Sequence, residues 1–123
     1  MHLFGLLGAQ VTMIGTKCPD IGGFTWIKGS PVAIGGDSAA ALGRVTVVEF
    51  FGTWCPPCRE TIPHLTAIQK RFASRGVVIV GVSTEEVAKV RPFVEKTGDD
   101  MGYLVVVDTS RQAHTGKWAC VAL

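Results

Sequence analysis

Two cysteines separated by two residues, Cys55 and Cys58, are the part of this sequence best suited to chemistry. They follow an apolar, strand-like run that includes Val47, and a helix-like segment comes after them. Thiols at this spacing on the first turn of a helix can close and open a disulfide by side-chain rotation, without refolding of the chain. The pattern therefore predicts dithiol–disulfide exchange.

The position of each thiol predicts its role. We expect Cys55 just outside the first helical turn, where unpaired N–H groups and the positive end of the helix favour a thiolate, and so as the attacking nucleophile. We expect Cys58 one turn deeper, as the resolving thiol. Pro56 and Pro57 have no N–H and remove two possible donors to the Cys55 sulfur. A reducing or mid-range potential follows from this weaker stabilisation of the thiolate.

A Cys-x-x-Cys pair could alternatively supply two of the four ligands of a zinc site. Zinc usually takes four protein ligands in a structural site, and this sequence has no second Cys/His pair. His64 and His114 are isolated, as are Cys18 and Cys120, so the chain's four cysteines do not form a disulfide framework. We therefore expect redox chemistry, with no metal and no cofactor.

Glu49 lies in the middle of the apolar strand-like run Val45–Phe51, where an acid is costly to bury. Alternation along a strand places it on the same face as Phe51, beneath the helix that carries the dithiol. Burial would raise the pKa of Glu49, and a carboxylate near Cys58 could take the proton of that thiol during exchange. The alternative is a glutamate on an edge strand that reaches solvent.

The rest of the chain alternates strands with helices, which are the elements needed to hold the dithiol. Two short apolar pieces suggest a small N-terminal hairpin, and three further strands alternate with three helices. The hairpin strands are Phe24–Ile27 and Val32–Ile34; the further strands are Val45–Phe51, Val77–Val82 and Leu104–Val107; the helices are Pro56–Arg75, Glu86–Thr97 and Asp108–Trp118. This order predicts an α/β fold with right-handed crossovers and a mainly parallel sheet.

Composition excludes several classes of protein. A chain of 123 residues, 47% of them hydrophobic, fits one small domain, which we place at 24–123 after an N-terminal segment at 1–23. Its net charge is +2 with scattered Lys and Arg, so we expect no nucleic-acid partner. No apolar run approaches the ~20 residues of a membrane helix. The N-terminal segment lacks a basic start, which favours a structural role and a cytoplasmic location over export or membrane tethering.

The run Trp-Cys-Pro-Pro-Cys at 54–58, followed by Arg59-Glu60 and Pro63, resembles the thioredoxin-like superfamily, and TlpA-type thiol–disulfide oxidoreductases in particular. The resemblance covers roughly Phe24 to Trp118. It implies a thioredoxin-like sheet flanked by helices, and an activity on disulfides of proteins or small molecules. Proteins of this family commonly have an acidic residue beneath the second cysteine, and the resemblance implies that Glu49 is that residue here.

The same resemblance implies a substrate surface beside the sulfurs. It carries the tryptophan before the first cysteine onto Trp54, and we expect Trp54, Pro56 and Pro57 to contact substrate. Packing in the core is the alternative for Trp54. The sequence does not indicate which partner reduces the disulfide.

One departure from the family concerns the C-terminal part. The cis-Pro loop, a β-hairpin and a last helix would follow the third helix, but the chain ends at Leu123 and its only proline after Pro63 is Pro92. We therefore expect a fold that lacks these elements, and two alternatives stay open. One is a peroxiredoxin-like peroxidase, for which Thr53 stands two residues before Cys55 but without the Pro-led motif. The other is a non-catalytic, truncated thioredoxin-like module.

Overall fold

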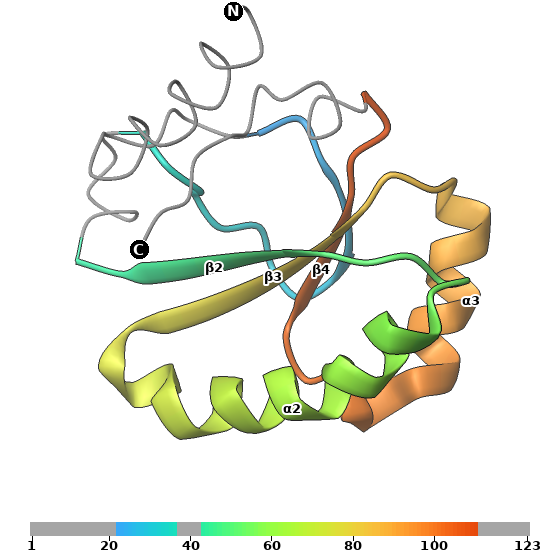
Figure 1. Ribbon diagram of the computed structural model, residues 1–123. Coiled ribbons are helices and arrows are strands. Elements are labelled where there is room, and N and C mark those ends of the chain that lie inside the picture. Colours follow the sequence, from blue (N-terminus) through green and yellow to red (C-terminus); the bar gives the residue numbers. More distant parts are fainter. Residues whose placement is uncertain (1–21, 37–42, 111–123) are drawn as a thin grey trace, which may run out of the picture.

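The computed structural model describes residues 22–36 and 43–110, and in this part of the chain one sheet carries two α-helices on the same face (Figure 1). The strands are β1 (Thr25–Lys28), β2 (Val45–Phe50), β3 (Val77–Ser83) and β4 (Leu104–Val107). The helices are α2 (Pro56–Phe72) and α3 (Val87–Thr97), each followed by a 3₁₀ turn, at Ala73–Arg75 and Gly98–Asp100.

The four strands lie in the order β1-β4-β3-β2. β2, β3 and β4 are parallel, and β1 is antiparallel to β4. The α/β class with a mainly parallel sheet is therefore confirmed. Parallel neighbours bring the loops after β2 and β3 to the same edge of the sheet, where α2 begins (Figure 1). Cys55 is the N-cap residue of α2 and Cys58 lies in its first turn.

The predicted hairpin between Phe24–Ile27 and Val32–Ile34 is wrong. β1 pairs with β4, with Thr25 opposite Val107, and Val32–Ile34 adds no strand to the sheet. The physical reason is that β4 is almost wholly buried, so the backbone groups on its second edge need hydrogen-bond partners. β1 supplies them, a long-range pairing that local sequence does not reveal.

The apolar composition of the predicted strand Val45–Phe51 is typical of a strand buried on both faces of a parallel sheet, but the structure places it differently. β2 ends at Phe50 and is the last strand in the order of the described sheet. Val45, Val47 and Phe50 are 48%, 37% and 51% exposed. A β-branched, apolar run indicates extended backbone, but it does not indicate how many strands pair with that run.

The two helices follow the prediction more closely. α2 turns Ile62 and Thr66 toward the sheet, and its 3₁₀ extension ends at Gly76, whose φ of 77° suits a glycine. α3 begins one residue after the expected Glu86. The predicted helix Asp108–Trp118 does not begin at Asp108, because that carboxylate accepts hydrogen bonds from the N–H and hydroxyl of Ser110 and closes a turn; its residues from 111 onward lie outside the described part.

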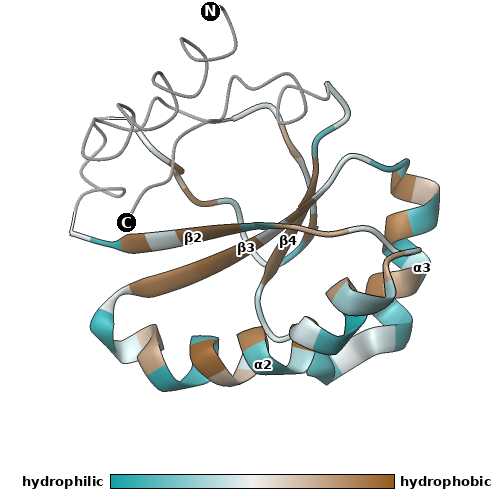
Figure 2. Cartoon of the chain, in the orientation of Figure 1, coloured by the Kyte–Doolittle hydropathy of each residue, from teal (hydrophilic) through white to brown (hydrophobic). Residues whose placement is uncertain are grey.

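Alternate side chains of the strands build one apolar cluster on each face of the sheet. β3 and β4 are apolar along most of their length (Figure 2). The cluster on the helix side consists of Phe51, Ile62, Ile79, Val90, Val94, Met101, Tyr103, Val105 and Val107. On the opposite face Val80, Val82 and Val106 pack with Ile34.

Neither α2 nor α3 is long and apolar enough to cross a membrane. Cys18, Cys120 and most of the proposed segment 1–23 lie outside the described residues, and the proposed domain division stays a prediction.

Candidate active site

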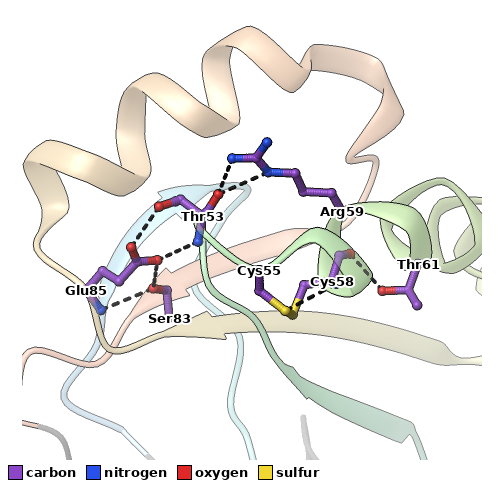
Figure 3. The surroundings of a disulfide bond; sticks show 7 residues. All are labelled: Thr53, Cys55, Cys58, Arg59, Thr61, Ser83 and Glu85. Atoms are coloured by element: carbon purple, nitrogen blue, oxygen red, sulfur yellow. Dashed lines mark hydrogen bonds between the residues drawn. A yellow bond between two sulfur atoms is a disulfide. The ribbon is translucent and has the colours of Figure 1, made fainter.

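Cys55 and Cys58 form a disulfide at the N-terminus of α2, with their Cα atoms 5.2 Å apart (Figure 3). Cys55 is the N-cap residue, with an extended backbone, and its sulfur accepts a hydrogen bond from the Cys58 N–H at 3.3 Å. Pro56 and Pro57 occupy the first two helical positions and donate none. Cys58 also packs against the apolar cluster on the helix side of the sheet. The predicted placement of both sulfurs is confirmed.

Trp54 lies on the surface rather than in the core. Its side chain is 75% exposed, so the core-packing alternative is wrong. Its indole covers Gly52, where an added Cβ would lie 2.7 Å from the indole Nε1, so this arrangement needs a glycine. Pro56 and Pro57 are exposed beside it. The three residues predicted to contact substrate thus share one surface next to the disulfide, and their role stays a prediction.

Glu49 lies on β2 directly opposite Gly81 of β3. Although β2 is an edge strand of the described sheet, the Glu49 atom Oε2 is buried and has no hydrogen-bond partner among the described residues. Burial raises the pKa of Glu49 from its ordinary value of 4.5 to about 7. The predicted rise is confirmed, and a solvent-directed carboxylate is excluded. Transfer of a proton between Cys58 and Glu49 stays a prediction.

Sequence reasoning missed the residue that holds the loop before the dithiol. Glu85 accepts a hydrogen bond from the Thr53 N–H at 2.7 Å and another from the Thr53 hydroxyl at 2.7 Å (Figure 3). The Ser83 hydroxyl donates to Glu85 Oε1 at 3.1 Å. Burial acts to raise the pKa of Glu85, but the bonds from Thr53 and Ser83 and the charge of Lys89 outweigh it and lower that pKa. Glu85 is therefore a carboxylate at neutral pH.

The run Ser83-Thr84-Glu85-Glu86 has the pattern of a helix start, a possible capping residue followed by acids. The helix N-cap is Glu86, whose side chain makes no capping hydrogen bond, and Glu85 binds Thr53 instead. A signal for this was present, because the acid directly follows a strand that neighbours the dithiol strand. Residues after adjacent parallel strands meet at one edge of the sheet.

Arg59 holds the other side of Thr53. Its Nε donates to the Thr53 carbonyl oxygen at 3.0 Å, and its Nη2 donates to the same oxygen (Figure 3). The guanidinium also lies over the ring of Phe93 on α3, 5.7 Å from its centre, and Phe93 stacks on Phe51. The backbone of Thr53 is thus fixed at both its N–H and its C=O, which orders the turn that presents Trp54 and Cys55.

Within residues 22–36 and 43–110, no three His, Cys, Asp or Glu side chains gather into a group that could hold a metal ion. The polar features of the described site are the disulfide at the start of α2, the contacts of Thr53 in the preceding loop, and Glu49 on β2, the strand that leads into that loop. This arrangement can present an electrophilic disulfide, or a nucleophilic thiol after reduction, at the surface of the molecule.

The chain is similar in sequence and structure to several known proteins. The thiol-disulfide oxidoreductase ResA of Bacillus subtilis is 38% identical over 71 residues, which cover 57% of this chain and 38% of that protein. A thiol:disulfide interchange protein of the thioredoxin family from Chlorobium tepidum has a structure with a TM-score of 0.62 and 34% identity, covering 78% of this chain and 62% of that one. The thioredoxin domain of a Bacteroides vulgatus thiol-disulfide oxidoreductase superposes with a TM-score of 0.62 at 23% identity, which shows the fold alone.

The thioredoxin-like fold predicted from the sequence is therefore confirmed. The chain spans about two fifths of the length of the ResA proteins it matches. The AhpC/TSA family matches residues 14–116, which include every described residue from β1 to β4. This chain belongs to the AhpC/TSA family of thioredoxin-like proteins.

Proposed function

We propose that this protein is a thiol–disulfide oxidoreductase that cycles Cys55 and Cys58 between a dithiol and a disulfide, and that it reduces its substrates. The observation that carries the proposal is the disulfide at the start of α2, in which the Cys55 sulfur accepts the Cys58 N–H. The same donor favours a Cys55 thiolate after reduction. Relatives named as thiol-disulfide oxidoreductases support this reading.

The proposed reaction has two displacement steps. The Cys55 thiolate attacks one sulfur of a substrate disulfide, that S–S bond breaks, and the first substrate sulfur leaves as a thiolate. Cys58 then loses its proton to the Glu49 carboxylate and attacks the Cys55 sulfur, which releases the second substrate thiolate. Two electrons pass from the dithiol to the substrate, and Glu49 returns its proton to the departing thiolate. An external thiol reductant restores the dithiol.

The surface around the sulfurs suits a peptide or small-molecule disulfide. Trp54, Pro56 and Pro57 are exposed and offer an apolar, rigid surface beside Cys55. We propose that these three residues contact the substrate while the disulfide is attacked. A cytoplasmic location stays our prediction from the sequence.

The peroxidase alternative receives less support. That alternative depends on Thr53, whose hydroxyl here donates a hydrogen bond to Glu85. Peroxide consumption by the purified protein, compared with its disulfide reduction, separates the two activities.

Reduction of insulin by dithiothreitol tests the proposal. The protein should accelerate it, and Cys55→Ser or Cys58→Ser should abolish the acceleration. A variant with Cys18→Ser and Cys120→Ser together is the matched control, because it removes two thiols and keeps the Cys-x-x-Cys pair. If the control loses activity while Cys55→Ser keeps it, or if the folded protein accelerates nothing, the assignment is wrong.

A further inference from the structure

Two buried side-chain oxygens in the described part of the chain have no hydrogen-bond partner there, Oε2 of Glu49 and the hydroxyl of Tyr103. Buried polar atoms are nearly always paired, because leaving one unpaired costs its full desolvation energy. Two such groups, one an acid and one a hydroxyl, can satisfy each other. Whether they do so depends on how close their positions in the sheet bring them.

Gly81 brings the two groups together. It lies on β3 between Glu49 of β2 and Val105 of β4, its cross-strand partners. A Cβ added to Gly81 would meet the Tyr103 ring atom Cε2 at 3.1 Å and the Phe51 ring at 3.4 Å. The Tyr103 ring thus reaches from the start of β4 into the space left by the missing side chain. There it lies next to the strand position of Glu49.

Electrostatics agree with this placement. Burial raises the pKa of Tyr103 well above its usual range, and the charge of Glu49 raises it further. Tyr103 therefore keeps its proton under all ordinary conditions and can act as a hydrogen-bond donor. The Glu49 carboxyl titrates close to neutrality, so it is the member of the pair that changes charge.

We propose that Tyr103 is a positioning residue for Glu49, with its hydroxyl donating a hydrogen bond to the ionised carboxylate across Gly81. Neither oxygen has a hydrogen-bond partner in the described structure, so the bond requires one of the two side chains to rotate toward the other. The bond favours the ionised form of Glu49 over the neutral form and fixes the direction of its oxygens. Its importance for catalysis rests on the proposed function, in which Glu49 receives the Cys58 proton, but the bond itself does not depend on that function.

The other described residues that face Glu49 do not offer the same contact. From β3, Ile79 and Gly81 share its face and do not titrate, and the next residue on that face, Ser83, donates to Glu85. From α2, Cys58 packs into the same apolar cluster, and the charged residues of that helix are exposed. α3 contributes apolar Val90 and Val94 to the cluster, and its charged residues are exposed.

Carbon-13 NMR titration of the glutamate carboxyls in the full-length protein tests the proposal without reference to turnover. Tyr103→Phe removes the donor and keeps the ring, so the Glu49 midpoint should rise by roughly one unit, the effect of a hydrogen bond to a charged group. Gly81→Ala, which displaces the Tyr103 ring, should raise it in the same direction. Thr97→Val is the matched control: it removes a hydroxyl that donates to Phe93 on α3 and should leave the midpoint unchanged.

The kinetic consequence is measured separately. The value of about 7 reflects burial alone, so the proposed bond places the wild-type Glu49 midpoint below it, and Tyr103→Phe should return the midpoint toward it. Because the ionised fraction of Glu49 near pH 7 then falls, Tyr103→Phe should slow the resolving step near neutrality and recover at higher pH. In a Glu49→Gln background Tyr103→Phe should have no further effect. An unchanged Glu49 midpoint in folded Tyr103→Phe and Gly81→Ala overturns the Tyr103 proposal even if the enzyme is active. If Tyr103→Phe shifts the Glu49 midpoint but leaves turnover unchanged, the contact between Tyr103 and Glu49 is supported and Glu49 has no part in the mechanism.

Discussion

Both carboxylate oxygens of Glu85 bind a single residue, Thr53, one through its N–H and the other through its hydroxyl, each at 2.7 Å. The two residues are 32 positions apart in the chain. They meet because β2 and β3 are parallel neighbours and the loops that follow these strands lie at the same edge of the sheet. The loop that presents the dithiol is therefore held by the residue that precedes α3.

Replacing Glu85 should loosen this loop. Glu85→Ala removes both acceptors from Thr53, so we expect a loss of about 1–3 kcal/mol in the free energy of unfolding, measured with urea. The Thr53 amide should also exchange its hydrogen faster than in the wild type. Glu86→Ala is the matched control, because Glu86 is the neighbouring acid and makes no capping bond. Equal losses in the two variants would contradict a specific contact between Glu85 and Thr53.

The free energy of unfolding should fall at acid pH because of Glu85. Its pKa is lowered in the folded protein, so its contribution is full above the unfolded value of about 4.5 and is lost as the pH falls through the folded value. Thermal unfolding between pH 7 and pH 3 measures this decrease. Glu85→Gln should reduce this loss of stability at acid pH. An equal loss in that variant would assign the acid sensitivity to other groups.

Glu49 should produce the opposite slope. Its pKa is raised to about 7, so the folded protein binds a proton more tightly than the unfolded chain, and stability falls as the pH rises from about 4.5 to about 7. We expect Glu49→Gln to stabilise the protein at pH 8 by about 1–2 kcal/mol, after allowance for solvent screening of a partly exposed group. Urea titrations at pH 5 and pH 8 measure the difference. A wild-type protein equally stable at both values, with Glu49→Gln unchanged, would show that Glu49 is not buried as described.

The two cysteines should differ in their ability to trap substrate. Cys58→Ser should accumulate a mixed disulfide with a model protein substrate, because Cys55 still attacks and nothing resolves the product. Cys55→Ser should accumulate little, since Cys58 packs against the apolar cluster. Non-reducing electrophoresis and mass spectrometry of the adduct measure both. Trapping by Cys55→Ser alone would reverse the assignment of nucleophile and resolving thiol.

The exposed tryptophan should matter for substrates more than for the fold. Trp54→Ala should lower kcat/KM for a protein disulfide about tenfold, since exposed aromatic residues supply much of the energy at binding surfaces. The matched control is Ile68→Ala, which removes an exposed apolar side chain farther along α2. Both variants should unfold at urea concentrations close to that of the wild type. Equal kcat/KM for the two variants would remove Trp54 from the substrate surface.

Local features were predictable from the sequence, and long-range ones were not. The bounds of β4, the start of α2 at Pro56 and the placement of Cys55 all depend on neighbouring residues, and each prediction is confirmed. The rise in the Glu49 pKa was also predictable, because an acid flanked by apolar strand residues is expected to be buried, and burial disfavours its charged form. These inferences use propensity, capping and burial, which act over a few residues.

The missed features all join distant parts of the chain. β1 pairs with β4 instead of with Val32–Ile34, because a buried strand needs partners on both edges. β2 is an edge strand of the described sheet although its composition is that of a central one. Glu85 binds Thr53 only because β2 and β3 are neighbours, which depends on the order of the strands in space.

The spacing of the two cysteines has a consequence for chain entropy. A disulfide stabilises a protein mainly by restricting its unfolded chain, and the restriction grows with the length of the closed loop. Cys55 and Cys58 are three residues apart, so their bond closes a very small loop and restricts the unfolded chain less than the ~3 kcal/mol expected of a loop of about 15 residues. Oxidation of this pair therefore adds little to the cohesion of the fold. In the proposed cycle the dithiol carries two electrons and the disulfide is the form that has given them up, so the change of redox state should alter the stability of the fold little.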